Sequence, residues 1–122
     1  MDNDNIKSKF LFEGLEVYQR SLRLAIYLSK IASEFPVKFS RIRDQLIGAA
    51  VSVPLNIAKG SGRQSVKERA NFYRFSRTSV FEIIPIIEIC YSLSLIDEKT
   101  YQSLREETII LSKMLNLFIR SL

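Results

Sequence analysis

The stretch SRIRDQLIGAAVSVPLNIAKGSGRQSVKE, residues 40–68, decides the fold of this chain. Apolar residues recur in its first part at the spacing of one helix face, which predicts a helix over residues 40–59. The Gly-Ser-Gly sequence at 60–62 is a natural helix stop. Ser65 and Glu68 have the S-x-x-E spacing of a capping box, which starts the next helix. The stretch therefore predicts two helices joined by a short turn.

The same helical periodicity continues on both sides of this stretch. A preceding helix is predicted over residues 15–35, where Pro36 ends it. The helix after the turn is predicted over residues 66–93 with a kink near Pro85, and Asp97 caps a last helix that runs to the C-terminus. Long amphipathic helices with short connections predict an all-α fold, an antiparallel up-down-up-down four-helix bundle.

A chain of 122 residues is expected to form one domain. We expect a loose N-terminal segment at 1–10 and a single four-helix-bundle domain at 11–122. Ser40 is the expected N-cap of the second helix, and Pro54 is expected to bend it. The apolar arcs of the first and third helices are wider than one buried face needs, which favours a homo-oligomer over a generously packed monomer.

The composition offers few of the side chains that enzymes use for catalysis. The chain has no histidine and a single cysteine, which removes the commonest metal ligand and general base and excludes an internal disulfide. Cys90 lies among apolar residues and is expected to be a buried, inert thiol. We therefore expect no enzyme, no metal and no cofactor. The N-terminus resembles no signal peptide and the longest apolar stretch is too short to span a bilayer, so we expect a cytoplasmic protein with no membrane contact.

Positive charge is concentrated in one third of the chain. The net charge of the whole chain is +5, but the segment from Lys38 to Arg77 holds nine basic residues and two acidic ones, a local net charge of +7. Such an excess attracts an anionic partner, and nucleic acid, either RNA or DNA, is the first candidate. The alternative is a solvated charged surface.

The turn at 60–62 places Arg63 beside a helix N-terminus, which favours phosphate. Lys67 and Arg74, seven residues apart, extend this as a basic line. The predicted nucleic-acid-binding residues are Arg63, Lys67, Arg74 and Arg77, with Lys59, Arg41 and Arg43 as auxiliaries. The alternative is that these side chains form salt bridges with acidic residues such as Glu82, Glu88 or the Glu106-Glu107 pair.

Aromatic residues alternate with these cations in the sequence Phe72-Tyr-Arg-Phe-Ser-Arg77, a mixture also found where bases stack. The helical spacing assigns Phe72 to the core and favours core or interface roles for Tyr73 and Phe75. Base-specific recognition is not predicted. Ser52 and Asn56 are expected to have a structural role near Pro54.

The segment AAVSVPLNIAKGSGR, residues 49–63, resembles the signature of the small bacterial four helix bundle family, the 23S rRNA intervening sequence proteins. The resemblance extends from Phe12 over most of the chain and includes the segment from Phe72 to Ser79. Lys59 departs from the pattern, because the family usually has Glu there.

This resemblance implies an up-down bundle that assembles as a pentameric ring. It also points to relatives that serve as accessory subunits of diversity-generating retroelements, where a basic pentamer engages nucleic acid and a reverse transcriptase. Two hypotheses follow: an oligomer that binds nucleic acid electrostatically, or a protein-interaction module, for example for a reverse transcriptase, that uses its broad apolar faces.

Overall fold

The computed structural model describes residues 10–122, so the segment expected to be loose lies outside the described residues except for Phe10. The described part of the chain is helical and contains no β-strand. Its elements are the short 3₁₀ helices η1 (Leu11–Gly14) and η2 (Val37–Phe39) and the α-helices α2 (Glu16–Ser33), α3 (Ser40–Ser61), α4 (Val66–Ser92) and α5 (Glu98–Arg120). The all-α class and the four long helices are confirmed.

Local signals set most helix ends. Ser65 is the N-cap of α4, and its side chain accepts a hydrogen bond from the Glu68 amide at 3.1 Å. Asp97 caps α5 in the same way, at 2.7 Å from the Thr100 amide, and the hydrogen bonds from Thr100 lower the pKa of the Asp97 carboxyl. The expected cap at Ser40 is wrong, because η2 precedes α3 directly and Phe39 occupies the N-cap position.

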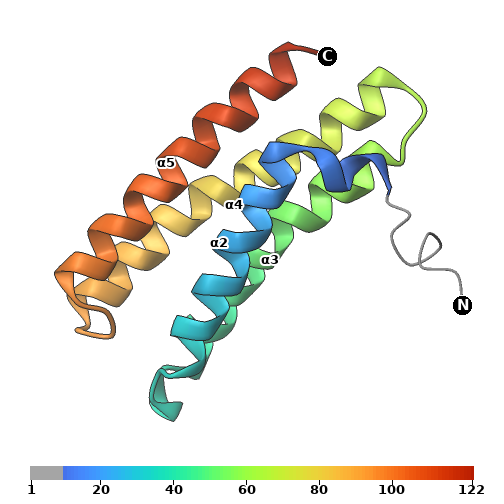
Figure 1. Ribbon diagram of the computed structural model, residues 1–122. Helices are drawn as coiled ribbons and strands as arrows, with labels where there is room; N and C mark the ends of the chain where they lie inside the picture. The colour runs from blue at the N-terminus through green and yellow to red at the C-terminus, as the bar shows by residue number, and fades with distance from the viewer. Residues whose placement is uncertain (1–9) are drawn as a thin grey trace, which may run out of the picture.

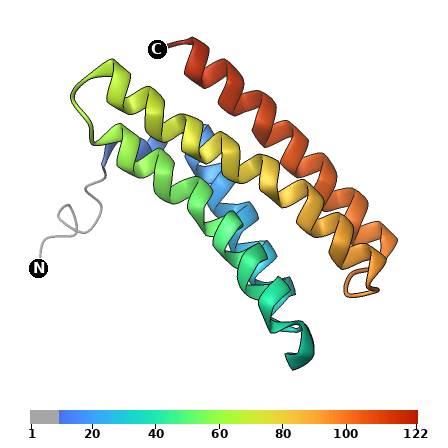
Figure 2. The ribbon, with the colours of Figure 1, turned by 180° about the vertical axis from the view of Figure 1, so that it is seen from behind.

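Successive helices run in opposite directions, and the chain forms two helical hairpins, α2 with α3 and α4 with α5 (Figure 1). The inner helices α3 and α4 pack along each other most extensively, and α5 packs mainly on α4. Seen from both sides, the hairpins diverge at the end that carries η2 (Figure 2). The opposite end of the α3–α4 pair carries the Gly-Ser-Gly turn.

Small residues let α3 and α4 approach closely. A Cβ atom at Gly60 would lie 2.7 Å from Cε1 of Tyr73 and 3.0 Å from Cβ of Phe72. Nearer the middle, the buried Ser76 hydroxyl donates to the Val53 carbonyl at 2.8 Å. α3 continues through Pro54, as α4 continues through Pro85.

Ser52 and Asn56 also belong to this contact between α3 and α4. The Ser79 hydroxyl donates to the Ser52 hydroxyl at 2.8 Å, and Nδ2 of Asn56 donates to both the hydroxyl and the carbonyl of Ser52 at 2.9 Å. The pair is therefore a structural element of the helix interface, as the sequence indicates.

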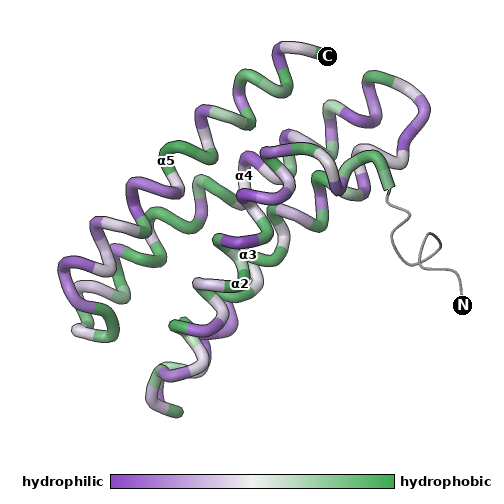
Figure 3. Tube along the Cα trace, viewed as in Figure 1, coloured by the Kyte–Doolittle hydropathy of each residue, from purple (hydrophilic) through white to green (hydrophobic). Residues whose placement is uncertain are grey.

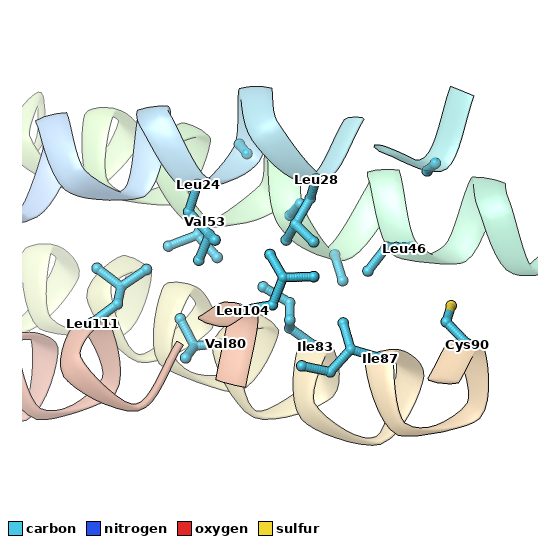
Figure 4. Close-up of a cluster of buried hydrophobic side chains, with 14 of the residues drawn as sticks. Leu24, Leu28, Leu46, Val53, Val80, Ile83, Ile87, Cys90, Leu104 and Leu111 are labelled. Carbon is cyan, nitrogen blue, oxygen red and sulfur yellow. The ribbon is translucent and has the colours of Figure 1, made fainter. Parts of the chain in front are cut away.

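The core runs between the two hairpins (Figure 4). Each helix contributes fully buried side chains, such as Leu28 from α2, Val53 from α3, Ile83 from α4 and Leu104 from α5. Figure 3 shows apolar positions recurring at short intervals along each helix, as the periodicity of the sequence predicts.

An apolar groove follows the outside of the α2–α3 hairpin. Its volume is about 670 Å³, and we call it the outer groove; its principal lining side chains are Phe12, Tyr18, Leu22, Ile26, Val51 and Leu55. A smaller apolar hollow of about 210 Å³ lies on the other hairpin, between Phe81 and Ile84 of α4 and Ile109 of α5. The bundle therefore carries uncovered apolar surface on both of its hairpins.

Candidate nucleic-acid interface

The α3–α4 turn holds Arg63 at one end of the molecule. The Arg63 amide donates to the Gly60 carbonyl at 3.0 Å, which closes the turn, and α4 begins three residues later. Its guanidinium lies over the Phe72 ring at 4.6 Å from the ring centroid. This cation–π contact orients an exposed arginine beside the N-terminus of a 27-residue helix.

The Phe72 ring is half-buried beneath Arg63 instead of lying in the core, which corrects its sequence assignment. The aromatic residue that enters the core is Tyr73, which is 3% exposed and packs against Phe118. Phe75, assigned to the core or an interface, is 54% exposed in this single chain. At this end of α4 the buried face therefore includes Tyr73 and not Phe72 or Phe75.

Arg69 holds the turn from within α4, although the spacing of the sequence did not single it out as a site residue. Its Nη1 donates to the carbonyl of Arg63 at 3.1 Å and to the carbonyl of Gln64 at 2.8 Å. These bonds satisfy two carbonyls that the turn leaves outside the helices. The local excess of charge included Arg69, but nothing in the pattern indicated that its side chain would fold back onto the turn.

Lys59 and Lys67 are exposed on either side of this turn, and Arg74 is exposed two helical turns further along α4. Nη1 of Arg74 donates to Oδ1 of Asn71 at 3.3 Å, a neutral partner that leaves the charge uncompensated. We call Lys59, Arg63, Lys67 and Arg74 together the basic end.

Three of the predicted residues are not exposed members of the α3–α4 turn region and are left out of the basic end. Arg77 is half-buried, and its Nη1 donates to Oδ1 of Asn116 at 3.2 Å, which ties α4 to α5. Arg41 and Arg43 are in the first turn of α3, and Arg43 pairs with Asp44 at 3.0 Å. At 1.5 Å per residue, Arg41 is about 27 Å from Lys59 along the helix axis. The structure therefore does not bring Arg41 and Arg43 into one surface with Arg63, whereas Arg77 is one helical turn beyond Arg74 and is held by Asn116.

The acidic residues proposed as salt-bridge partners for the basic line pair elsewhere or not at all. Glu88 pairs with Arg105 at 3.4 Å, and Glu107 pairs with Arg20 at 3.1 Å and raises the pKa of that guanidinium through their hydrogen bond. Within residues 10–122, no carboxylate lies within 4.0 Å of a charged nitrogen of the basic end. The salt-bridge alternative for these four cations is wrong for the described residues.

The described residues offer few other groups that could bind a metal ion or act as a nucleophile. No group of three or more His, Cys, Asp or Glu side chains among them is placed to hold a metal ion. Cys90 is fully buried, and this burial raises the pKa of its thiol to about 11, as expected for an inert thiol. No helix in the described part of the chain is long and apolar enough to cross a membrane.

The fold and the site thus define a small helical bundle whose basic end forms no ion pair within residues 10–122. The chain belongs to the family of 23S rRNA-intervening sequence proteins, whose sequence pattern matches residues 13–117. The fold is similar to the crystal structure of a protein of unknown function from the S23 ribosomal protein family of Bacteroides thetaiotaomicron VPI-5482. That likeness has a TM-score of 0.75 at 19% identity and covers 84% of this chain and 97% of that one. A comparison with curated proteins found no significant match.

Proposed function

We propose that this protein is a non-enzymatic, homo-oligomeric bundle that binds RNA or DNA electrostatically through the basic end. The observation that carries the proposal is the group of four exposed cations, three at the α3–α4 turn and Arg74 two helical turns along α4, with no carboxylate within ion-pair distance in residues 10–122. Such a group binds the phosphate backbone by releasing its counterions, which gives affinity without strong sequence preference.

Two further features support phosphate as the ligand of the basic end. The amides of Val66 and Lys67 have no partner within α4, although Ser65 caps the Glu68 amide, and the dipole of this long helix favours a negative charge at its N-terminus. Arg69 and the contact of Arg63 with Phe72 hold the turn in one conformation, so less conformational entropy is lost when an anion binds.

Charge reversal tests this surface directly. We expect the double variant Arg63→Glu, Arg74→Glu to weaken binding of single-stranded RNA on the order of tenfold near physiological salt, and to do so for every sequence. The slope of log K against log salt should also become shallower by about 0.7–0.9 for each phosphate that the variant no longer neutralises. Fluorescence anisotropy across a salt series measures both quantities.

The matched control is the double variant Arg41→Glu, Lys99→Glu, which changes the net charge equally at exposed positions away from the α3–α4 turn. We expect it to keep its affinity within about twofold, because nonspecific long-range attraction is screened at physiological salt. Equal losses in both double variants would mean that net charge alone drives binding. Unchanged binding in the first would remove the basic end from the proposal.

We further propose that copies of the chain assemble into a pentameric ring through the outer groove. A contact between the outer groove of one copy and the hollow on the α4–α5 hairpin of the next joins two different surfaces. Such heterologous contacts generate closed rings when the rotation between copies is suitable. A ring repeats the basic end in each subunit, and weak phosphate contacts then gain by avidity.

Leu55→Glu tests the assembly, because it places a charge on the floor of the outer groove at a residue that is 51% exposed in the single chain. We expect the native mass, measured by sedimentation velocity, to fall from that of a pentamer to that of a monomer. Val37→Glu, in η2 outside the outer groove, should leave the mass unchanged. A monomeric wild-type protein would contradict the ring and leave the outer groove for a different protein, the alternative that the sequence raises.

A further inference from the structure

An exposed aromatic ring lies within the basic end. Phe75 is 54% exposed, although it is one helical turn from the half-buried Phe72. The two ring centroids are 5.7 Å apart and the rings stand nearly perpendicular, at 87°. Because the Arg63 guanidinium covers Phe72, an arginine and two rings form a continuous packed group that ends in the exposed ring of Phe75.

Cations flank this ring on its own helix. Arg74 is the preceding residue and Lys67 lies two helical turns before Arg74, and both are exposed. Asn71, one turn before Phe75, accepts the hydrogen bond from Arg74 and so keeps this guanidinium close to the surface of α4. The ring of Phe75 is therefore presented to solvent beside exposed cations to which the proposed function assigns phosphate binding.

We propose that Phe75 stacks on an unpaired nucleobase while the basic end binds the adjoining phosphates, so that the ligand is single-stranded nucleic acid. The inference rests on the proposed function, since it assigns a strand state to the same site. A base in a duplex is already stacked on both faces, whereas an unpaired base offers a free π-face to an aromatic side chain. Stacking of this kind does not distinguish the bases, in agreement with the sequence, which does not predict base-specific recognition.

Substitutions at Phe75 separate stacking from simple apolar packing. Phe75→Tyr keeps the ring, whereas Phe75→Leu keeps an apolar side chain and removes the ring. We expect Phe75→Leu to bind a single-stranded RNA oligonucleotide about 5- to 100-fold more weakly than wild type, the loss expected for one stacked base. Phe75→Tyr should stay within about threefold of wild type. Neither variant should change the salt slope, because neither changes a charge.

Two probes then identify the base as the contact. An oligonucleotide of the same length with abasic sites keeps its phosphates, and a duplex hides its bases; we expect Phe75→Leu and wild type to bind each of these equally. The chain contains no tryptophan, so Phe75→Trp creates a single indole fluorophore. Its emission should be quenched by the intact single strand and not by the abasic one. Ile89→Trp, at an exposed position on the same helix that lies outside both the outer groove and the hollow of the α4–α5 hairpin, should not respond to either.

Equal binding of the intact strand by Phe75→Leu, Phe75→Tyr and wild type would overturn the stacking proposal. A change of native mass in Phe75→Leu would overturn it as well, because it would place this ring between two copies of the chain. Salt-dependent binding that Arg63→Glu, Arg74→Glu weakens would still uphold the proposed function in both cases. Failure of the proposed function is recognised separately, by the absence of salt-dependent binding in the wild-type protein.

Discussion

Gly60→Ala should lower the free energy of unfolding by about 1–2 kcal/mol, although alanine is the better helix former. The new Cβ would lie 2.7 Å from Cε1 of Tyr73 and 3.0 Å from Cβ of Phe72. Neither neighbour moves easily, since Tyr73 is buried and its hydroxyl is 3.0 Å from that of Ser61, and the Phe72 atom is attached to the α4 backbone. Overpacking of about 1–3 kcal/mol then exceeds a propensity gain of about 0.5–1 kcal/mol.

Gly48→Ala is the matched control, because Gly48 lies in the same helix and a Cβ there meets no atom within 4 Å. It should raise the free energy of unfolding by about 0.5–1 kcal/mol. Urea titration of both variants, at one fixed protein concentration, measures the difference. Two stabilised variants would mean that α3 and α4 are not in close contact at Gly60.

The Gly60 variant should also affect the basic end. The Gly60 carbonyl accepts the bond from the Arg63 amide that closes the turn. If α3 and α4 separate to admit the methyl group, the distance from Arg63 to Phe72 lengthens as well. We therefore expect Gly60→Ala to bind RNA more weakly than Gly48→Ala does.

The helices could be predicted because their signals are local. Pro36, Ser65 and Asp97 each act within one turn of the chain, and the structure has helix ends beside all three. The wrong cap at Ser40 arose because a short 3₁₀ helix directly precedes α3, and the sequence offers no separate signal for it. The end of α4 also has no clear sequence signal. The helix ends at Ser92, and Ser94 adopts a φ of 60°, a conformation for which glycine is the usual residue.

The site could be predicted only where neighbours in the chain define it. The short distance in sequence between the turn and the start of the next helix predicted that Arg63 lies near Lys67, and in the structure both residues are at the same end of the bundle. Periodicity gives the width of an apolar face but not its centre, so it assigned Phe72 to the core and left Tyr73 with a core or interface role, whereas Tyr73 is the buried residue of the two. α4 packs against both α3 and α5, and the direction of its buried face depends on both neighbours.

Partners of charged side chains depend on tertiary distances that the sequence does not contain. Glu88 was a possible partner for the basic line, yet it pairs with Arg105 across the α4–α5 hairpin. Arg77 belongs to the basic line by spacing, but it bonds to Asn116 on α5. For Arg77 and Glu88, the packing of α5 decides the partner.

Leu104, a buried residue of α5, is the position at which we expect the second large loss of stability. This side chain is 1% exposed and lies in the cluster formed with residues of the other helices (Figure 4). We expect Leu104→Ala to lower the free energy of unfolding by about 2–5 kcal/mol, because apolar transfer free energy is forfeited and a cavity remains. Leu117→Ala removes the same atoms from the same helix at a residue that is 63% exposed, and should change stability by less than about 0.5 kcal/mol.

Hydrogen exchange should show where the stability decreases. α5 packs mainly on α4 and less extensively on α2, whereas α3 and α4 hold each other along their length. In Leu104→Ala we expect the amides of α5 to lose protection from exchange first. The amides of α3 around Val53, which packs against Ser76 of α4, should remain protected. Equal destabilisation by Leu104→Ala and Leu117→Ala would contradict the core position of Leu104. Uniform loss of protection would instead show that the two hairpins unfold as one cooperative unit, so that the basic end depends on α5 even though α5 contributes none of its four cations.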